Sequence, residues 1–315
     1  MNKVYISNIL GAPSPTAVIM SNEDVELLDW KKIAEETYNY LKRKEINFSK
    51  MAIISEKNTN SYKFKFVQIK IKDGALSLES NANCGNSMIA SARVIYKLNE
   101  TENNKNISKV LITNVDTNLQ FLIDKVEDSF NIEILNLKGK EIDSFKMFKK
   151  SEKNKIVIDD EEIEFSMVNA VNEYIIVNAE NIGIKSKEAL LSLNETDKMI
   201  LPKVKQIRSA IKEKYNLDKE SEFPKIAIVY SDGVLAARTV YLDGWHKGLP
   251  ITGAITIMIT SKMQDSVIYN KDLIEDIIET PKGEKNVHIE LDDLNIIKSC
   301  LIYNVKSEGS IEQIL

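Results

Sequence analysis

Histidine and cysteine are scarce in this sequence, with two of each among 315 residues. Cys84 and Cys300 stand far apart, and neither lies at metal-ligand spacing from His246 or His288, so the sequence offers no zinc-type site. Two distant cysteines also exclude the disulfide framework that staples small secreted domains, and we expect both to be reduced thiols.

Long apolar runs and an excess of one charge are missing too. No stretch of about 18 apolar residues occurs, and the first ten residues lack the charged and apolar regions of a signal peptide. Lys and Arg number 42 against 47 Asp and Glu, a net charge of −5 that gives no electrostatic footprint for nucleic acid or an anionic membrane. No Walker or GxGxxG loop is present. We therefore expect a cytoplasmic protein with neither nucleic acid nor membrane as partner.

What is present is the pattern of an α+β chain with two similar halves. A length of 315 residues favours about two domains of ~150 residues. Amphipathic helices are predicted over 29–44 and 203–216, and buried strands follow at 51–55 and 226–230. In each half a small polar loop then enters an apolar helix. We predict two facing half-barrels, the domains 1–165 and 166–315.

The most informative stretch surrounds Cys84, in the segment Asn83-Cys84-Gly85-Asn86-Ser87. A cysteine in the first turn of a helix feels the positive end of the helix dipole and free backbone N–H groups, which favour its reactive thiolate form. Gly85 lets a ligand approach the backbone, where those N–H groups can hold a carboxylate. The alternative is a small buried cysteine at a helix cap with a structural role only. Composition alone favours neither the reactive nor the structural cysteine.

A matching helix start is predicted in the second half at Thr252-Gly253-Ala254. By itself this is an ordinary N-cap threonine followed by a glycine. Facing Cys84, it would give a second anion-binding helix terminus. His246 and Lys247 precede it in a loop, where a single histidine is more often a surface residue than a functional one.

Several of these stretches together resemble the 2-methylaconitate cis–trans isomerase (PrpF) family, which has the two-domain fold of diaminopimelate epimerase. The strand Ser49–Ser55 resembles that family's Ser-Lys-Val strand, and Asn83–Asn86 resembles its Gly-Asn-Cys-Gly-Asn helix start. Lys50 and Cys84 are 34 residues apart (84 − 50), the spacing expected of the family's catalytic lysine and cysteine. The stretch 168–172, ending in Asn172, resembles its Asp-Ala-x-Asn-Pro turn. The loop His246-Lys247 and the following Thr252-Gly253-Ala254 resemble its His-Arg-Ala loop and Thr-Gly-Ala helix start. These four stretches occur in the same order as in the family and span nearly the whole chain.

The sequence also departs from the family pattern at substrate-anchoring positions. The family's Gly-Gly-Thr-Ser-Lys-Gly turn reads here Gly11-Ala12-Pro13-Ser14-Pro15-Thr16, in which the first glycine and Ser14 remain. Glu173 replaces a proline. Lys247 replaces an arginine, which keeps the charge and loses the planar fork that binds a carboxylate in two places.

The resemblance implies both a fold and a chemistry. Each half would be a β-barrel-like sheet wrapped around a central helix, with the active site in the cleft between the halves. Lys50 and Cys84 would act as acid and base, moving a proton along a three-carbon unit of a small unsaturated di- or tricarboxylate, without cofactor or metal. Which of the two is the base stays open. The substrate-binding residues would be Ser14, Asn83, Gly85, Asn86, Ser87, Asn172, His246, Lys247, Thr252, Gly253 and Ala254.

Two other functions remain open at this stage. An amino-acid racemase or epimerase of the same fold uses two opposed cysteines, whereas the second helix start here reads Ile251-Thr252-Gly253. A binding protein that retained the fold and lost the reaction is compatible with the altered turn at Pro13–Thr16. The oligomeric state is not specified by the sequence, and a homodimer is compatible with it.

Overall fold

The computed structural model describes residues 2–72, 74–80, 82–102, 107–137, 154–241, 244–292 and 296–315. Contacts between Cα atoms divide the chain into two compact units, and each is described by itself. Unit 1 comprises Met1–Asn136 and Tyr303–Leu315, and unit 2 comprises Leu137–Ile302. The sequence favoured domains 1–165 and 166–315; residue 165 lies within a strand of unit 2.

In its described residues, unit 1 contains two helices, a short 3-10 turn at its end and nine strands, the last of which begins in unit 2. The elements are β1 (Lys3–Ile9), β2 (Thr16–Ser21), α1 (Trp30–Arg43), β3 (Lys50–Asn58), β4 (Ser61–Lys72), β5 (Ala75–Glu79), α2 (Gly85–Thr101), β6 (Lys109–Asn114), β7 (Gln120–Val126), β8 (Ser129–Ile134), η1 (Leu135–Leu137) and β17 (Ile297–Gln313).

Eight of these strands form a closed sheet. The pairings run from β17 through β1, β2, β3, β4, β6 and β7 to β8, which returns to β17. The β2–β3 and β4–β6 pairs are parallel, and β5 extends as a hairpin from β4. The consecutive strands β6, β7 and β8 are antiparallel and form a meander.

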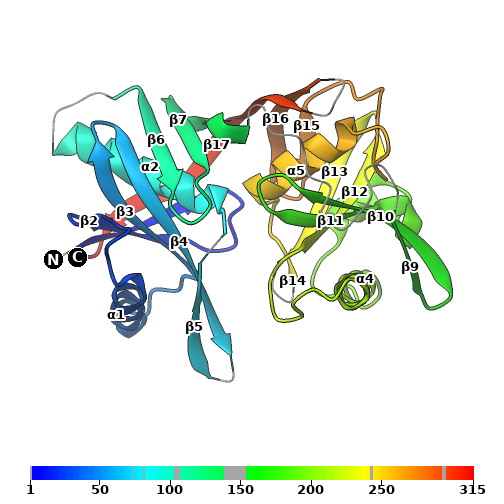
Figure 1. The fold of residues 1–315 in the computed structure, drawn as a ribbon, viewed down its shortest axis with the longest axis horizontal. Coiled ribbons are helices and arrows are strands. Elements are labelled where there is room, and N and C mark those ends of the chain that lie inside the picture. The colour runs from blue at the N-terminus through cyan, green and yellow to red at the C-terminus, as the bar shows by residue number, and fades with distance from the viewer. Residues whose placement is uncertain are drawn as a thin grey trace. The chain divides into compact units, whose positions relative to one another are not determined.

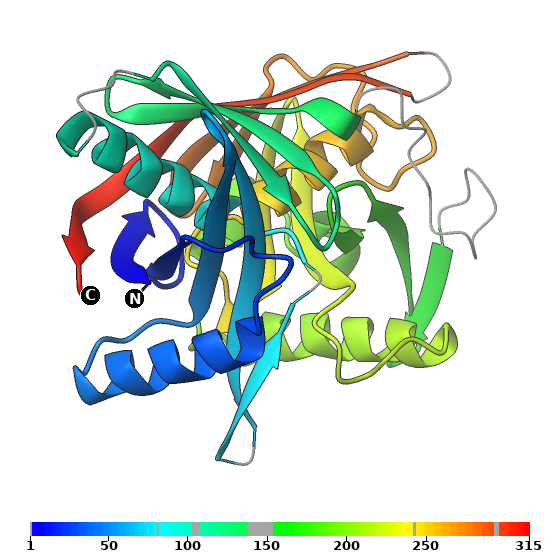
Figure 2. The ribbon, with the colours of Figure 1, turned by 60° about the vertical axis from the view of Figure 1, so that its left-hand side comes forward.

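The two helices of unit 1 lie on opposite faces of the β2–β3–β4 part of this sheet (Figures 1 and 2). Helix α1, predicted over 29–44, buries Ala34, Thr37 and Leu41 along one helical stripe, and Asp29 caps it by accepting a hydrogen bond from the Lys32 N–H at 3.2 Å. Helix α2 is buried on most sides and packs against β1, β2, β3 and β6. Its small and apolar sequence permits this close packing.

Unit 2 repeats much of this order. Its elements are β9 (Asn154–Ile158), β10 (Glu161–Asn169), β11 (Glu173–Asn178), η2 (Ala179–Ile182), α3 (Lys187–Ser192), α4 (Ile200–Lys214), β12 (Lys225–Asp232), β13 (Val234–Tyr241), β14 (Gly244–Trp245), α5 (Ile251–Lys262), β15 (Ile277–Thr280), β16 (Gly283–Leu291) and the first part of β17. Helix α4 covers an apolar cluster on one face of the sheet, and α5 packs against β10, β11 and β16.

The order of strand pairings is the same in the two units. From β1 to β7 the pairs are antiparallel, parallel, antiparallel, parallel and antiparallel, and from β10 to β16 the same five types follow in the same order. In this correspondence β12 matches β3 and α5 matches α2. The fold thus supplies two equivalent positions at which a buried helix begins.

The start of α5 differs from the sequence prediction. The helix begins at Ile251 with Pro250 as its N-cap, so Thr252 lies inside the first turn and is not the N-cap residue. A proline has φ fixed near the value a helix needs and can stand at such a start without an N–H to satisfy. The buried hydroxyls farther along α5 are satisfied locally, since Thr256 and Thr260 each donate to the carbonyl four residues earlier.

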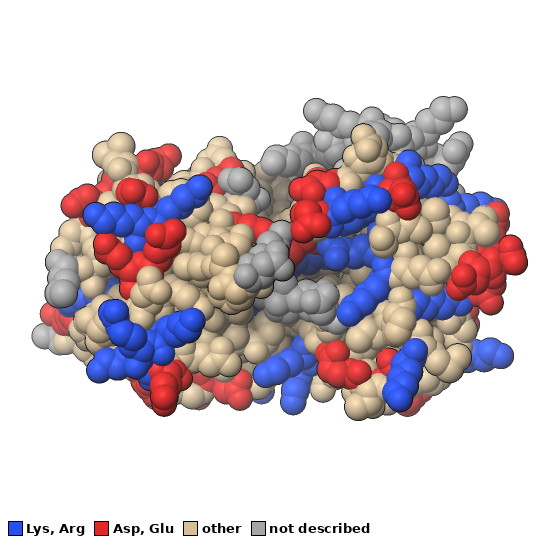
Figure 3. Space-filling model, turned by 90° about the horizontal axis from the view of Figure 1, so that it is seen from below, with Lys and Arg blue, Asp and Glu red and all other residues tan. Residues whose placement is uncertain are grey.

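Among the described residues, no helix has the length and apolar character needed to span a membrane. Acidic and basic side chains both occur across the face of the molecule shown in Figure 3. This agrees with the mixed charge of the sequence, and it is the pattern of a solvated surface.

Candidate active site

Cys84 is the N-cap residue of α2, as the sequence predicted for a cysteine at a helix start. Its backbone is extended, with φ −127° and ψ 97°, and its carbonyl accepts the first helical hydrogen bond from the Met88 N–H at 3.0 Å. The thiol does not cap the helix, and Cys84 as a whole is half-buried. The sulfur atom is therefore available to other partners beside the free N–H groups of the first turn.

One of those partners is Ser87, three residues along the helix. Ser87 Oγ donates to Cys84 Sγ at 3.2 Å, and it also lies 3.1 Å from Thr16 Oγ1 on β2. Both hydroxyl residues are buried. The spacing of three residues explains the first contact, since such side chains lie on one face of a helix. The second contact joins the helix start to the sheet.

Lys50 lies on the same face of the sheet as Thr16. It is the first residue of β3, only 4% exposed, and it stands directly opposite Thr16 on β2 and Gln68 on β4. Side chains directly opposite each other in paired strands share a face, and neighbours along a strand alternate.

The apolar cluster under α1 shows which face this is. That cluster takes the alternate residues of the same strands, among them Ala17, Met51 and Val67. Thr16, Lys50 and Gln68 therefore face the other way, toward α2, where Thr16 meets Ser87. In unit 1, Lys50 thus faces α2 beside Thr16, which contacts Ser87 next to the Cys84 thiol.

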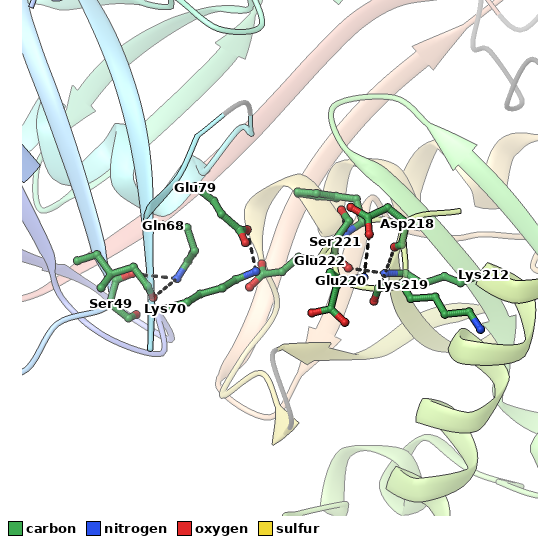
Figure 4. Close-up of polar contacts among 12 residues, drawn as sticks. Ser49, Gln68, Lys70, Glu79, Lys212, Asp218, Lys219, Glu220, Ser221 and Glu222 are labelled. Atoms are coloured by element: carbon green, nitrogen blue, oxygen red, sulfur yellow. Dashed lines mark hydrogen bonds and ion pairs between the residues drawn. The ribbon is translucent and has the colours of Figure 1, made fainter. Parts of the chain in front are cut away.

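Ser14 is held next to this group through Ser49. The two hydroxyl oxygens are 2.6 Å apart, and the Ser49 carbonyl accepts a hydrogen bond from Gln68 Nε2 at 2.9 Å (Figure 4). Ser49 directly precedes Lys50. The altered turn that carries Ser14 is therefore fixed to the strand start that carries the lysine.

Asn83 has a supporting role that the sequence did not indicate. Its Oδ1 accepts from Asn114 Nδ2 at 2.9 Å and from Thr117 Oγ1 at 2.7 Å, and Asn114 also donates to the Ala82 carbonyl at 3.0 Å. These bonds hold the segment before α2 against the end of β6. Asn86, in the first turn, is also buried. Asn83 thus anchors the loop before Cys84, and its side-chain oxygen already accepts two hydrogen bonds.

Unit 2 gathers several of the other predicted residues at the start of α5. Asn172 Nδ2 donates to Thr252 Oγ1 at 3.2 Å, and both side chains are buried. Gly253 follows where Tyr174 approaches closely, since a Cβ on Gly253 would lie 2.8 Å from the Tyr174 hydroxyl. Ala254 is fully buried. This is the position equivalent to the start of α2.

The two predicted residues of the loop before α5 differ in their exposure to solvent. His246 is buried, and its backbone N–H donates to the Thr239 carbonyl at 2.8 Å. Its ring Nδ1 accepts from the Gly248 backbone N–H at 3.2 Å. With Nδ1 accepting, the neutral imidazole carries its proton on Nε2. Lys247 is exposed. Burial also raises the pKa of the Glu173 carboxyl, which stands where the family has proline.

Several residues of this arrangement gave no signal in the sequence. Thr16, Gln68 and Asn114 are ordinary polar residues of strands, and only the strand register shows that they lie beside Lys50 or the Cys84 loop. A search for alternating polar positions in otherwise buried strands could have found Thr16 and Gln68. Within the described ranges, no group of three or more His, Cys, Asp or Glu side chains could hold a metal ion.

Comparisons with known proteins identify the fold. No protein-family model matches the chain, and no curated protein matches it in sequence. Among solved structures it is similar to a methylitaconate-delta-isomerase, with a TM-score of 0.63 and 17% identity, covering 100% of this chain and 94% of that one.

Two further structures have the same fold. One is a hydroxyproline epimerase from Agrobacterium vitis, with a TM-score of 0.62, 10% identity and coverage of 99% and 92% of the two chains. The other is a probable proline racemase from Agrobacterium radiobacter K84, with a TM-score of 0.58, 10% identity and coverage of 99% and 93%. The chain therefore has the fold that the methylitaconate isomerase shares with these epimerases and racemases, as the sequence resemblance predicted.

Proposed function

We propose that this protein is a cofactor-independent isomerase of small unsaturated di- or tricarboxylates. One observation carries the proposal: Lys50 stands opposite Thr16 in the β2–β3 pair, and Thr16 contacts Ser87, which donates to the Cys84 thiol. The fold shared with a methylitaconate-delta-isomerase supports the same class of reaction.

The two side chains suit a proton shift along three carbons. One of them removes a proton from a carbon made acidic by conjugation to a carboxylate. The electron pair spreads over the double bond and onto the carboxylate oxygens. The other group then gives a proton to the carbon two positions away, so the double bond moves and no atoms are gained or lost. N–H groups at Gly85 and Asn86 supply donors for the charge that develops.

In unit 2, we propose that Asn172, Thr252 and the start of α5 bind a carboxylate of the substrate. Asn172 and Thr252 already bond to each other, and Gly253 keeps side-chain atoms away from the backbone of the first turn. That both halves act on one substrate, with His246 and Lys247 contributing, stays a prediction from the sequence.

The racemases and epimerases of this fold suggest a second reaction, which this chain is poorly equipped to perform. The start of α5 has Pro250 and Ile251 where a second thiol would be needed. The other cysteine of the sequence, Cys300, lies in β17 and is 1% exposed. A reaction with one thiol and one lysine fits the residues better than one with two opposed thiols.

Proton–deuterium exchange distinguishes these reactions. The native protein is incubated in D₂O with a panel of unsaturated di- and tricarboxylates and with proline and hydroxyproline, and deuterium in the recovered acids is read by NMR. We expect deuterium at an allylic carbon of at least one unsaturated acid and none at the α-carbon of the amino acids. Exchange at the amino-acid α-carbon alone would overturn the proposal in favour of racemisation.

A further inference from the structure

We propose that Thr16 and Ser87 are positioning residues that orient the Cys84 thiol and favour its thiolate form. The inference rests on the proposed function only in taking Cys84 as the reactive group. It assigns Ser87 a role different from the substrate contact predicted from the sequence, and it adds Thr16, which was not among the predicted site residues.

The hydrogen-bond chain has a defined direction. Ser87 has one hydroxyl proton, and it donates that proton to Cys84 Sγ. The Ser87 oxygen can then only accept from Thr16, whose Oγ1 lies 3.1 Å away. Both donors thus point toward the sulfur. A chain of this kind is polarised along its length, so each bond strengthens the next when the sulfur carries a negative charge.

The hydrogen-bond chain stabilises the thiolate because its hydroxyl groups are buried. Ser87 is 0% exposed and Thr16 is 2% exposed, so water does not compete for their hydroxyl groups. Hydrogen bonds to a charged acceptor are stronger than those to a neutral one, and this difference favours the thiolate over the thiol. The free N–H groups of the first turn of α2 act in the same direction.

The hydrogen-bond chain also connects the Cys84 thiol to the strand that pairs with the start of β3 at Lys50. Thr16 stands directly opposite Lys50 in the parallel β2–β3 pair, and its hydroxyl reaches Ser87 on α2. The helix start is therefore connected to β2, beside the start of β3, by the Thr16 hydroxyl, which belongs to neither the Lys50 strand nor the Cys84 stretch. Removing the Thr16 hydroxyl breaks this connection while leaving both motifs intact.

The test is the pH dependence of alkylation of Cys84 by iodoacetamide in the full-length folded protein, followed on the Cys84 peptide by mass spectrometry. The variants are Ser87→Ala, Thr16→Val and Thr16→Ser. Ser91→Ala is the matched control, because Ser91 is buried one turn farther along α2 and donates to the Ser87 carbonyl at 2.9 Å without touching the thiol.

We expect Ser87→Ala to move the midpoint of the pH–rate curve upward by about one pH unit. Thr16→Val should move it in the same direction by less, because Thr16 acts through Ser87. Thr16→Ser should restore the native midpoint, and Ser91→Ala should leave it unchanged. Alanine is a good helix former, so Ser87→Ala should fold even if Thr16→Val does not.

Unchanged midpoints in Ser87→Ala and Thr16→Val, or an equal shift in Ser91→Ala, would overturn the inference. The result is independent of turnover. A shifted midpoint without deuterium exchange by the native protein would leave the positioning role standing and refute the isomerase. Deuterium exchange with unshifted midpoints would support the isomerase and overturn the positioning role.

Discussion

At the scale of single residues, the surroundings of the two cysteine thiols differ. Cys84 is half-buried, with a hydroxyl donor at 3.2 Å, whereas Cys300 is enclosed in β17, where burial raises the pKa of its thiol to about 12. Thiolate is the form that reacts with alkylating reagents, so Cys300 has almost none of the reactive form at pH 8.

We therefore predict that iodoacetamide at pH 8 modifies Cys84 in the native protein and leaves Cys300 unmodified. Peptide mass spectrometry after a short exposure measures this directly. In a denaturant both thiols should react, which serves as the control for peptide recovery. Labelling of Cys300 at a rate similar to that of Cys84 in the folded protein would contradict the structure.

A buried lysine of unit 2 stabilises a loop of that unit. Lys212 on α4 is 3% exposed, and its ammonium donates to the carbonyls of Asp218 at 3.1 Å, of Lys219 at 3.5 Å and of Ser221 (Figure 4). Arg208, one turn earlier, donates to the Pro224 carbonyl at 2.8 Å. Together they hold the loop that leads into β12.

Replacing this lysine should destabilise the protein. Lys212→Met keeps the stem and removes the donors, which we expect to lower the free energy of unfolding by about 1–3 kcal/mol. Urea unfolding followed by circular dichroism measures the change. Lys214→Met on the same helix is the control, because Lys214 is exposed, and its loss should stay within about 0.5 kcal/mol. Equal losses in the two variants would show that the loop carbonyls do not depend on Lys212.

At this scale part of the candidate site could be proposed from the sequence. Lys50 and Cys84 could be identified from their motifs, and the cap at Asp29 from its side chain. The partners of Thr16 and Asn114 could not be, because the contacts of a polar strand residue depend on the strand or loop beside it. The pairing of Thr16 with Lys50 joins residues 34 positions apart, and no local pattern reports it.

At the scale of elements, the repeated order of strand pairings gives each unit a buried helix that begins at an equivalent position. Lys50 starts β3 opposite Thr16, and Lys225 starts β12 opposite Tyr174. The two helix starts differ in chemistry, with a thiol on α2 and a proline before α5. This division agrees with our proposal of proton transfer in unit 1 and carboxylate binding in unit 2.

The start of α5 allows a test of close packing. Gly253→Ala would bring a methyl group to 2.8 Å from the Tyr174 hydroxyl and 3.2 Å from its Cζ. Overpacking of this kind costs about 1–3 kcal/mol, so thermal unfolding should occur at a lower temperature. The double variant with Tyr174→Phe should recover part of the loss, with Tyr174→Phe alone as the reference. No recovery would mean that the hydroxyl contact does not limit this position.

The elements themselves could be predicted better than their ends. The apolar run of α5 was evident, but Thr252 has the side chain of an N-cap and the helix starts one residue before it. The reason is that Pro250 supplies the start, while the Thr252 hydroxyl accepts from Asn172. A local pattern could not distinguish these two uses of a threonine.

At the scale of the whole chain, the C-terminal residues belong with the N-terminal unit. β17 pairs with β1, bringing Gln313 opposite Tyr5 and Glu308 opposite Asn8. Sequence periodicity reports which faces are buried and says nothing of partners some 300 residues away. The halves proposed from the sequence therefore could not include this return, although the similarity of their element order could be predicted.

The central claim is that Lys50 transfers a proton to or from the substrate. The most direct measurement compares deuterium exchange into an unsaturated acid that the native protein labels, using native protein, Lys50→Ala and Lys57→Ala. Lys57 is an exposed residue at the far end of the same strand. Proton transfer by a positioned group typically contributes about 10²–10⁴-fold, so Lys50→Ala should lose exchange by that factor and stay folded, while Lys57→Ala keeps the native rate. Exchange by Lys50→Ala at the native rate would contradict the account.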